Sequence, residues 1–405
     1  MACAWVEARL LPRLAGGRRR LAALVLASVA AAPAWGQEYQ LAVGVDPAYD
    51  DNVLRLPSNV SPEQVGAGDR PRGSKIYRGY LAVNAKIPVG RQGVEVNLVG
   101  NAFKYPEYSY LDYTALNGAF TWRWQAGDRW SGVALYEHIK AIAPFIDFTP
   151  VVQNLRTFDT ARVTAEYWLH PSWRPYVGAT WTNASSSFAL VERGDVEVYA
   201  GELGVKYQAA GDNNIRGVVS YSRGEYPNRI AGDPFGVQYS QYDVGLDMQW
   251  NFTDRTSLYG RVAHTERQYS DAPGRDFAGP TGNLAFNWGL TGKTAIRFDL
   301  RREDLAGRYY VTEVAGVTPV WNITAVLRLE ASYEHWRRTY PNGGVTNLPA
   351  REDALDFARV MLRWAPARSW LFSLGYQWST RDSNVTLGDV HDNFIVATLQ
   401  FSLNQ

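Results

Sequence analysis

The chain has 405 residues, with 41 Lys and Arg against 40 Asp and Glu, so its formal net charge is only +1. This balance provides no strongly basic surface and excludes nucleic acid as the expected partner. The chain contains 15 Trp, 24 Tyr and 15 Phe but a single cysteine, Cys3, which excludes an intramolecular disulfide. No segment after the first 36 residues approaches roughly 18 consecutive apolar residues, so a helical membrane protein is also excluded.

Residues 1–36 have the layout of a cleaved secretory signal peptide. Arg13 and the arginines at 18–20 form a positive segment, residues 21–32 are apolar, and Ala34-Trp35-Gly36 matches a small-x-small cleavage site. A membrane anchor is the alternative, but a spanning helix needs roughly 20 apolar residues. We expect export through the Sec pathway and a mature domain of residues 37–405.

The mature chain alternates between apolar and polar residues with a period of two. In "TALNGAFTWRW" at 114–124, Leu116, Phe120 and Trp122 share one face, whereas Asn117 and Arg123 share the other. The segments "YDVGLDMQW", "AIRFDLR", "AVLRLEASYE" and "WLFSLGYQWS" show the same pattern. This alternation predicts β-strands with two different faces.

The connections between these strands alternate in length. Short turns are expected near 88–93, 125–129, 169–173, 209–214, 252–255, 290–293, 318–323 and 364–369, and longer polar loops near 50–75, 140–155, 186–194, 227–238, 341–353 and 382–392. This layout predicts an all-β fold, a transmembrane antiparallel outer-membrane β-barrel of about 18 strands. The alternative, a soluble sandwich or propeller, would have no use for aromatic rings at every turn.

Aromatic residues flank the short turns, as in "WRWQAGDRWSG" at 122–132. Trp and Tyr favour the membrane–water interface because the ring is apolar while its N–H or O–H needs a polar partner. We therefore predict a periplasmic aromatic girdle that contains Trp122, Trp124, Trp130, Trp250, Trp288, Trp364 and Trp370. A second, outer band is predicted to include Tyr105, Tyr136, Tyr221, Tyr333 and Tyr376.

The opposite face of the strands carries charges of both signs. The residues predicted to face the lumen and its solute are Arg123, Arg162, Glu166, Glu202, Lys206, Asp243, Asp247, Arg261, Arg297, Asp299, Arg301, Arg328, Glu330, Arg359 and Arg363. A barrel of about 18 strands is wide enough for an aqueous channel. Two interpretations stay open: neighbouring opposite charges pair across strands, or Arg297, Arg301, Arg328 and Glu330 form a selective strip.

Catalytic and metal-binding motifs are scarce. The five histidines, His138, His170, His264, His335 and His391, are scattered outside any nucleophile or metal-binding motif, so no enzymatic activity and no catalytic residue are predicted. Barrel closure would bring Asp50 and Asp51 near Asp389 and Asp392, whose oxygens could hold Ca²⁺ at the seam. The alternative is that these are ordinary loop residues, and no other cofactor is expected.

The loop at 140–155 is unusually apolar for an exposed connection. It contains "AIAPFIDFTPVV", from which we predict partial burial, including that of Phe145 and Phe148. The sequence does not decide whether this loop folds into the lumen as a constriction.

The segments "YDDNVLRLP", "RGEYPNR", "GRDFAGPTG", "TGKTAIRFDLRRE" and "TRDSN" resemble the EpsL family, outer-membrane proteins of exosortase-associated exopolysaccharide gene clusters. The resemblance extends over the mature chain and implies a role in export or assembly of an extracellular polysaccharide. It also implies periplasmic or inner-membrane export components as partners. Outer-membrane barrels typically end on an aromatic residue, whereas here Phe401 stands four residues before the end, in "LQFSLNQ".

The predicted function is that of an outer-membrane barrel that assists the passage of an exopolysaccharide chain, as conduit or accessory. The expected surroundings are the lipid bilayer and lipopolysaccharide. Two alternatives remain: a general diffusion porin, and a non-conducting scaffold whose loops bind surface glycan.

Overall fold

The computed structural model describes residues 38–404 apart from 147–150, 305–309, 341–350 and 386–387. In this part of the chain, 18 strands form one antiparallel sheet. The strands are β1 (Glu38–Asp50), β2 (Ser74–Val89), β3 (Gln92–Lys104), β4 (Tyr113–Ala126), β5 (Trp130–Ile142), β6 (Leu155–Tyr167), β7 (Trp173–Ser186), β8 (Val196–Gln208), β9 (Asn214–Glu225), β10 (Gln238–Thr253), β11 (Thr256–Tyr269), β12 (Phe277–Trp288), β13 (Thr294–Asp304), β14 (Val311–Asn322), β15 (Leu327–Tyr340), β16 (Arg351–Ala367), β17 (Trp370–Ser383) and β18 (Val390–Asn404).

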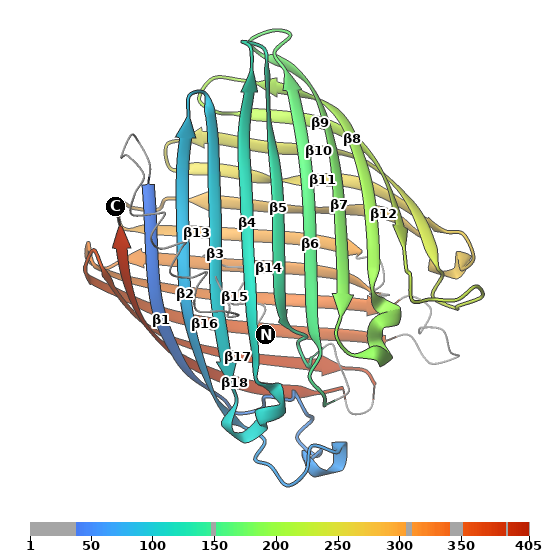
Figure 1. The fold of residues 1–405 in the computed structure, drawn as a ribbon, viewed down its shortest axis with the longest axis vertical. Helices are drawn as coiled ribbons and strands as arrows, with labels where there is room; N and C mark the ends of the chain where they lie inside the picture. Colours follow the sequence, from blue (N-terminus) through green and yellow to red (C-terminus); the bar gives the residue numbers. More distant parts are fainter. Residues whose placement is uncertain (1–37, 147–150, 305–309, 341–350, 386–387, 405) are drawn as a thin grey trace, which may run out of the picture.

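The sheet closes on itself because the first strand pairs with the last. β1 is bonded to β2 on one side and to β18 on the other, with Leu41 opposite Leu403 and Asp50 opposite Phe394. Figure 1 shows the resulting barrel, whose wall is made of long, tilted strands. Closure leaves no free sheet edge, so backbone hydrogen bonds are satisfied within the wall, as hydrocarbon requires. The predicted signal peptide lies outside the described residues.

Each strand presents an apolar face outward. On β10, Tyr242, Val244 and Leu246 are 56%, 60% and 52% exposed, whereas Asp243 and Asp247 point to the other face. The same alternation around the wall creates an apolar outer surface and a polar lumen, the arrangement of a transmembrane barrel. No helix in the described part of the chain is long and apolar enough to cross a membrane.

Aromatic side chains form a band beside the short turns on the outer surface. Ring pairs join neighbouring strands there, with centroid distances of 4.9 Å for Trp130 and Tyr167 and 5.0 Å for Trp370 and Phe401. The seven tryptophans of the predicted girdle all lie on this outward face, by the pairing register. Phe401 thus lies in the aromatic band, although it is not the final residue.

The outer band differs from the prediction at Tyr105. Tyr136, Tyr221, Tyr333 and Tyr376 are exposed on the outer surface, but Tyr105 is buried in a cluster of loop residues. The prediction for Tyr105 was wrong because the chain leaves β3 at Lys104 and turns into a short 3-10 helix, η2 (Pro106–Leu111).

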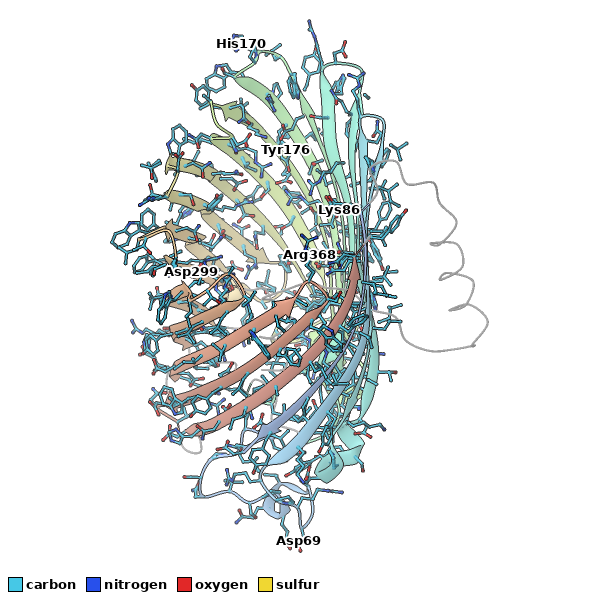
Figure 2. All side chains as sticks on the ribbon, turned by 90° about the vertical axis from the view of Figure 1, so that its left-hand side faces the viewer. Asp69, Lys86, His170, Tyr176, Asp299 and Arg368 are labelled. Carbon is cyan, nitrogen blue, oxygen red and sulfur yellow. The ribbon has the colours of Figure 1, made fainter. Side chains whose placement is uncertain are left out.

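The two ends of the barrel carry different connections. Asp69, in the long loop after β1, and His170, in the short turn after β6, lie at opposite ends of the molecule (Figure 2). Glu38 and Asn404, the first and last described residues, lie at the end with the short turns, which is the periplasmic end in outer-membrane barrels. The 3-10 helices η1 (Glu63–Val65), η2, η3 (Ala189–Gly194) and η4 (Pro273–Arg275) all lie in loops at the other, extracellular end.

Two details of the predicted connections were wrong. The turn expected at 318–323 lies at 323–326, because β14 continues to Asn322 and β15 starts at Leu327. The loops at 105–112 and 270–276 were not predicted. In the first of them, Tyr108 and Tyr110 belong to η2.

Candidate functional site

The inward face of the barrel wall carries the charged residues that were predicted to face the solute. Pairing places the predicted lumen residues on the face opposite the apolar surface, for example Asp247 opposite Arg216 and Arg261, and Arg328 opposite Arg363. Since every second residue of each strand points inward, all fifteen predicted positions fall on this face. These residues could be recognised from the sequence because apolar and polar residues alternate along each strand with a period of two.

One group of lumen charges lies on β6–β11 and is held by ion pairs. The Arg162 guanidinium and the Tyr176 hydroxyl both donate to the Glu202 carboxylate. Asp247 accepts hydrogen bonds from Arg216, with a distance of 3.0 Å from Nε, and its other oxygen lies 3.7 Å from Nε of Arg261.

A third carboxylate in the same region also lies between cations. Glu166 lies 3.2 Å from Lys206 Nζ and 3.9 Å from Arg174 Nη1. Cations and carboxylates thus alternate along this part of the wall.

A second group lies on β13–β17 and is richer in arginine. Arg297 is 2.6 Å from Asp299, Arg301 is 3.3 Å from Glu303, and Arg328 is 3.1 Å from Glu330. These partners are two residues apart on the same strand, whereas the sequence suggested pairing across strands.

Pairing between strands also occurs in this group. Glu330 lies 3.3 Å from Arg363 on β16, and Arg359 Nε donates to Gln377 Oε1 at 3.3 Å. Both of the interpretations left open by the sequence, pairing and a collective strip, are compatible with this geometry.

Aromatic side chains stand among these arginines. The Trp336 indole, on the inward face of β15, lies under the guanidinium groups of Arg301 and Arg338, at 5.1 and 5.6 Å from the ring centroid. Its Nε1 donates to Glu334 Oε2 at 2.8 Å, and its ring packs against Phe357 at 5.1 Å. Sequence reasoning missed this residue because it concentrated on charged positions; the alternation in "ASYEHWRR" already places Trp336 opposite Tyr333 and His335.

Three loops pack together at the extracellular end of the lumen, and we call them the loop cap. They are the described residues of 51–73, 105–112 and 143–154. Their apolar side chains form one buried cluster that includes Leu54, Tyr108 and Leu111 together with Ile142 at the end of β5, and Phe145 and Val151 pack against it. Partial burial of Phe145 was predicted and is confirmed; Phe148 lies outside the described residues.

Hydrogen bonds link these loops in series across the mouth. The Tyr108 hydroxyl donates to the Pro71 carbonyl at 2.6 Å, and Gln153 Nε2 donates to the Asp112 carbonyl at 2.8 Å. Arg381 Nη1, on the inward face of β17, donates to the Ile146 carbonyl at 2.6 Å. Through Ile146, the described part of the loop at 143–154 therefore reaches from β5 to a strand elsewhere in the wall, which narrows the entrance.

Inward residues near this contact are buried. Leu355 and Ser379 have no exposed surface and Gln377 is 1% exposed, although all three belong to the lumen wall. A wall that faced open water would leave such side chains accessible. The lumen is therefore filled on the side of β16–β18 at this depth.

The seam between β1 and β18 contains a buried ion triad. Arg55 Nη2 lies 2.8 Å from Asp50 Oδ2 and 3.2 Å from Asp392 Oδ2, and these side chains are at most 6% exposed. Burial alone would lower the pKa of Arg55, but the carboxylates of Asp50 and Asp392 outweigh it and raise the pKa, so the guanidinium remains charged.

This triad lies where calcium was predicted to bind. The Arg55 guanidinium occupies the position between Asp50 and Asp392 that the calcium hypothesis gives to a metal ion. Asp51 instead accepts hydrogen bonds from the backbone and side chain of Asn393, both at 2.7 Å, and Asp389 accepts one from the Ser383 backbone. Within the described residues, no group of three His, Cys, Asp or Glu side chains is arranged to hold a metal ion.

The histidines are likewise dispersed. His138 and His335 lie on the outer surface beside Asp159 and Asp356, at 2.7 and 2.9 Å, and His170 lies in a periplasmic turn. His264 lies 3.5 Å from Glu266.

No family model matches this chain, and no curated protein matches it in sequence. Solved structures do match in fold. A BenF-like porin from Pseudomonas fluorescens Pf-5 has a TM-score of 0.52 at 12% identity, over 91% of this chain and 99% of that one. Pseudomonas aeruginosa OccK2 (OpdF) has a TM-score of 0.51 at 11% identity, over 91% and 98%.

These likenesses define the class of fold. The closed wall of 18 described strands, the apolar outer surface and the aromatic band are those of an outer-membrane channel-like β-barrel, similar to the Occ porins. The chain is an outer-membrane protein in contact with the lipid bilayer. At such low identity the similarity shows the fold and does not extend to a substrate.

Proposed function

We propose that this barrel is a selective channel for carbohydrate that carries carboxylate groups, and that it assists the passage of an acidic exopolysaccharide or its fragments across the outer membrane. The observation that carries the proposal is the position of Trp336 among the arginines of the lumen wall. The function needs no covalent chemistry and no cofactor.

The chemistry of this part of the wall suits an acidic sugar. A flat indole offers its face to the apolar face of a pyranose ring, while guanidinium groups donate paired hydrogen bonds to a carboxylate. Arg301 and Arg338 lie beside Trp336, and Glu334 provides an acceptor for sugar hydroxyls. Because many of these charges are already paired, each contact with a passing chain is weak, which permits movement rather than trapping.

Two further observations support this proposal, and neither of them concerns the geometry of the lumen. The resemblance to the EpsL family implies an exopolysaccharide pathway, in which the barrel would receive its chain from periplasmic or inner-membrane export components. Among solved structures of similar fold, one is Pseudomonas aeruginosa OccK2 (OpdF) in complex with glucuronate, an acidic sugar, with a TM-score of 0.50 at 10% identity over 91% and 98% of the two chains. That ligand belongs to OccK2; it makes an acidic sugar the natural first probe here.

Single-channel conductance of the refolded mature chain in a planar bilayer tests the proposal. We expect open channels that fragments of the organism's acidic exopolysaccharide block and that uncharged dextran of similar size does not. Channels indifferent to both glycans would instead support a general diffusion porin. A protein that inserts but never conducts would support a scaffold barrel.

A pair of tryptophan variants ties the result to the lumen. Trp336→Ala should weaken block by the acidic fragments by about tenfold, the effect of losing one stacking contact. Trp378→Ala is the matched control, because Trp378 lies on the outward face of β17 at a similar depth, opposite Ala358. If the acidic fragments block the two variants equally, Trp336 does not contact the passing glycan.

A further inference from the structure

The segment "FAGPTG", at 277–282, forms the extracellular end of β12. It contains two glycines and a proline, which are residue types that strands usually avoid. β12 pairs with β13, so two of the segments that resemble the EpsL family, "GRDFAGPTG" and "TGKTAIRFDLRRE", meet at one seam of the wall. The proposed function gives this seam no role.

The backbone pairing between β12 and β13 ends early. Its last described pair is Gly282 opposite Arg302, whereas β12 continues to Phe277 in pairing with β11, and β13 continues to Asp304 in pairing with β14. Among the described residues, 277–281 of β12 and 303–304 of β13 therefore have no partner across this interface, and we call these residues the unpaired seam.

Pro280 explains where the pairing stops. A proline has no backbone N–H and cannot donate to the neighbouring strand. Pro47 and Pro319 interrupt the β1–β18 and β14–β15 pairings in the same way, but there the pairing resumes at the next residue. No described pair between β12 and β13 follows beyond Pro280.

Gly282 gives β12 a point at which to bend, at the base of the unpaired seam. Its φ is 155°, and a Cβ at this position would lie 2.3 Å from the Arg261 carbonyl oxygen on β11. Only glycine fits such a close approach between two backbones.

Two arginine side chains hold the unpaired seam together. On the lumen side, Arg267 of β11 spans β12 to reach Asp304, with Nη1 3.1 Å from the carboxylate and Nη2 donating to the carbonyl at 2.7 Å. On the outer side, Arg302 Nη1 donates to the Pro280 carbonyl at 2.8 Å, and its Nε lies 3.1 Å from Glu313. Side-chain contacts thus replace backbone pairing at this place.

Contacts of this kind can be exchanged, unlike a ladder of backbone hydrogen bonds. A guanidinium binds carboxylates through paired, charge-assisted hydrogen bonds, and a carboxylate of a glycan offers the same oxygens as Asp304. If it replaced Asp304 on Arg267 and the Pro280 carbonyl on Arg302, β12 would separate from β13 without the loss of any backbone pair below Gly282. A neutral glycan has no group that can compete in this way.

The unpaired seam lies at the level of the lipid headgroups. Pro280 stands eight residues before Trp288 on β12, the same spacing as that of Tyr242 before Trp250 on β10. The two tryptophans belong to the periplasmic band, and the Tyr242 ring lies 4.9 Å from that of Tyr221 in the outer band. An opening here would join the lumen to the polar headgroup region rather than to hydrocarbon, which suits a hydrophilic chain.

We propose that the unpaired seam is a side exit of the lumen, opened when carboxylates of an acidic glycan take the guanidinium groups of Arg267 and Arg302 from Asp304 and the Pro280 carbonyl. The proposal rests on the proposed transport of acidic carbohydrate and adds the route by which the chain leaves. The loops of the cap, which narrow the extracellular mouth, all arise between β1 and β6 and leave this seam uncovered by the cap.

An engineered disulfide across the unpaired seam tests the exit. Thr281→Cys with Glu303→Cys places thiols at the positions that follow Gly282 and Arg302 in the register, and the only natural cysteine, Cys3, precedes the mature chain. The mature protein is reconstituted into liposomes loaded with fluorescent oligogalacturonate, and efflux is measured before and after oxidation. We expect oxidation to slow efflux by about tenfold while potassium conductance is preserved.

A second pair of cysteines is the matched control. Ala200→Cys with Ser222→Cys joins β8 and β9, whose pairing continues to the extracellular rim, so its oxidation should leave efflux unchanged. Mass spectrometry of proteolytic fragments verifies each disulfide. Equal efflux through the oxidised and reduced forms of the seam variant would overturn the proposal.

Hydrogen exchange detects opening of the unpaired seam without a disulfide. In the unaltered protein, oligogalacturonate should accelerate amide exchange of residues 277–282 several-fold, whereas maltooligosaccharide of the same length should not. Pro280→Val restores the missing N–H and should reduce this response; Pro319→Val, at a strand proline where pairing already resumes, should not. Exchange that is insensitive to oligogalacturonate would contradict the proposal.

Block of the channel distinguishes a failure of the side exit from a failure of the proposed function. If oligogalacturonate blocks conductance in neither the oxidised nor the reduced protein, the transport proposal fails and the side exit fails with it. If it blocks both forms but oxidation leaves efflux unchanged, transport of acidic carbohydrate stands and only the side exit is overturned.

Discussion

Arg381 Nη1 donates a hydrogen bond to the carbonyl oxygen of Ile146 at 2.6 Å, although the two residues are 235 positions apart in the chain. The same guanidinium donates from Nε to the Gly388 carbonyl, also at 2.6 Å. One side chain on the lumen wall thus anchors both the loop at 143–154 and the loop that connects β17 with β18. Its guanidinium thus satisfies a carbonyl group in each of the two loops.

Arg381→Ala should release the loop at 143–154 from β17. The expected result is a larger single-channel conductance with more frequent fluctuations, because the narrowing at the mouth is no longer fixed. Limited proteolysis should cut this loop faster in the variant. Arg337→Ala is the control, since Arg337 lies on the outer surface beside Glu352 at 3.3 Å; matching conductance in the two variants would contradict the anchoring role.

Arg55→Met should destabilise the barrel seam strongly. It leaves the buried carboxylates of Asp50 and Asp392 facing each other without a cation, and breaking a buried pair in this way costs about 3–5 kcal/mol. Arg55 also holds a left-handed backbone conformation, with φ of 55°, that non-glycine residues adopt only at a cost. The midpoint of urea unfolding in detergent measures the change.

The control for the seam is an exposed ion pair on the neighbouring strand. Lys86 lies 3.1 Å from Glu38, and both side chains are more than half exposed. Lys86→Ala should therefore change stability by less than about 1 kcal/mol. Similar changes in unfolding stability for the two substitutions would show that burial of the Arg55 triad contributes nothing to the stability of the barrel.

Calcium provides a separate test of the same seam. Because a guanidinium already lies between Asp50 and Asp392, we expect that neither added calcium nor a chelator shifts the melting temperature of the unaltered protein. Asp51→Ala should lower it in both conditions, since Asp51 accepts two hydrogen bonds from Asn393 across the seam. A rise in melting temperature that calcium produces and Asp51→Ala abolishes would restore the metal hypothesis.

The fold was predictable because its signals are local. Period-two alternation and short Gly or Asp turns specify strands and their faces within about ten residues. The ends of β10 and β17, for example, follow directly from the aromatic and turn residues there. The inward position of residues such as Asp247 then follows from the alternation, whereas the strand number also depends on the spacing of the connections.

The features that could not be predicted from the sequence depend on contacts between distant segments. Nothing near Ile146 indicates that Arg381 will reach it, and nothing in "YDDNVLRLP" shows that Arg55 will turn back between two aspartates. Tyr105 was misplaced for the same reason, because its burial depends on loops that meet only after the barrel closes. Loop packing is decided by tertiary contacts, which a periodic pattern does not encode.

Asp112 should make the loop cap sensitive to acid. Its carboxylate accepts hydrogen bonds from the Tyr105 backbone and from Lys104 Nζ, both at 2.7 Å. Burial alone would raise the pKa of Asp112, but these contacts outweigh it and lower the pKa below its ordinary value near 4. The stabilisation is therefore complete above the ordinary value and is lost as the pH falls through the lowered one. Hydrogen exchange of residues 105–112 should accelerate below about pH 4. In Asp112→Asn, the same residues should exchange quickly at every pH. Parallel pH profiles for the two proteins would mean that another group controls the stability of the loop cap.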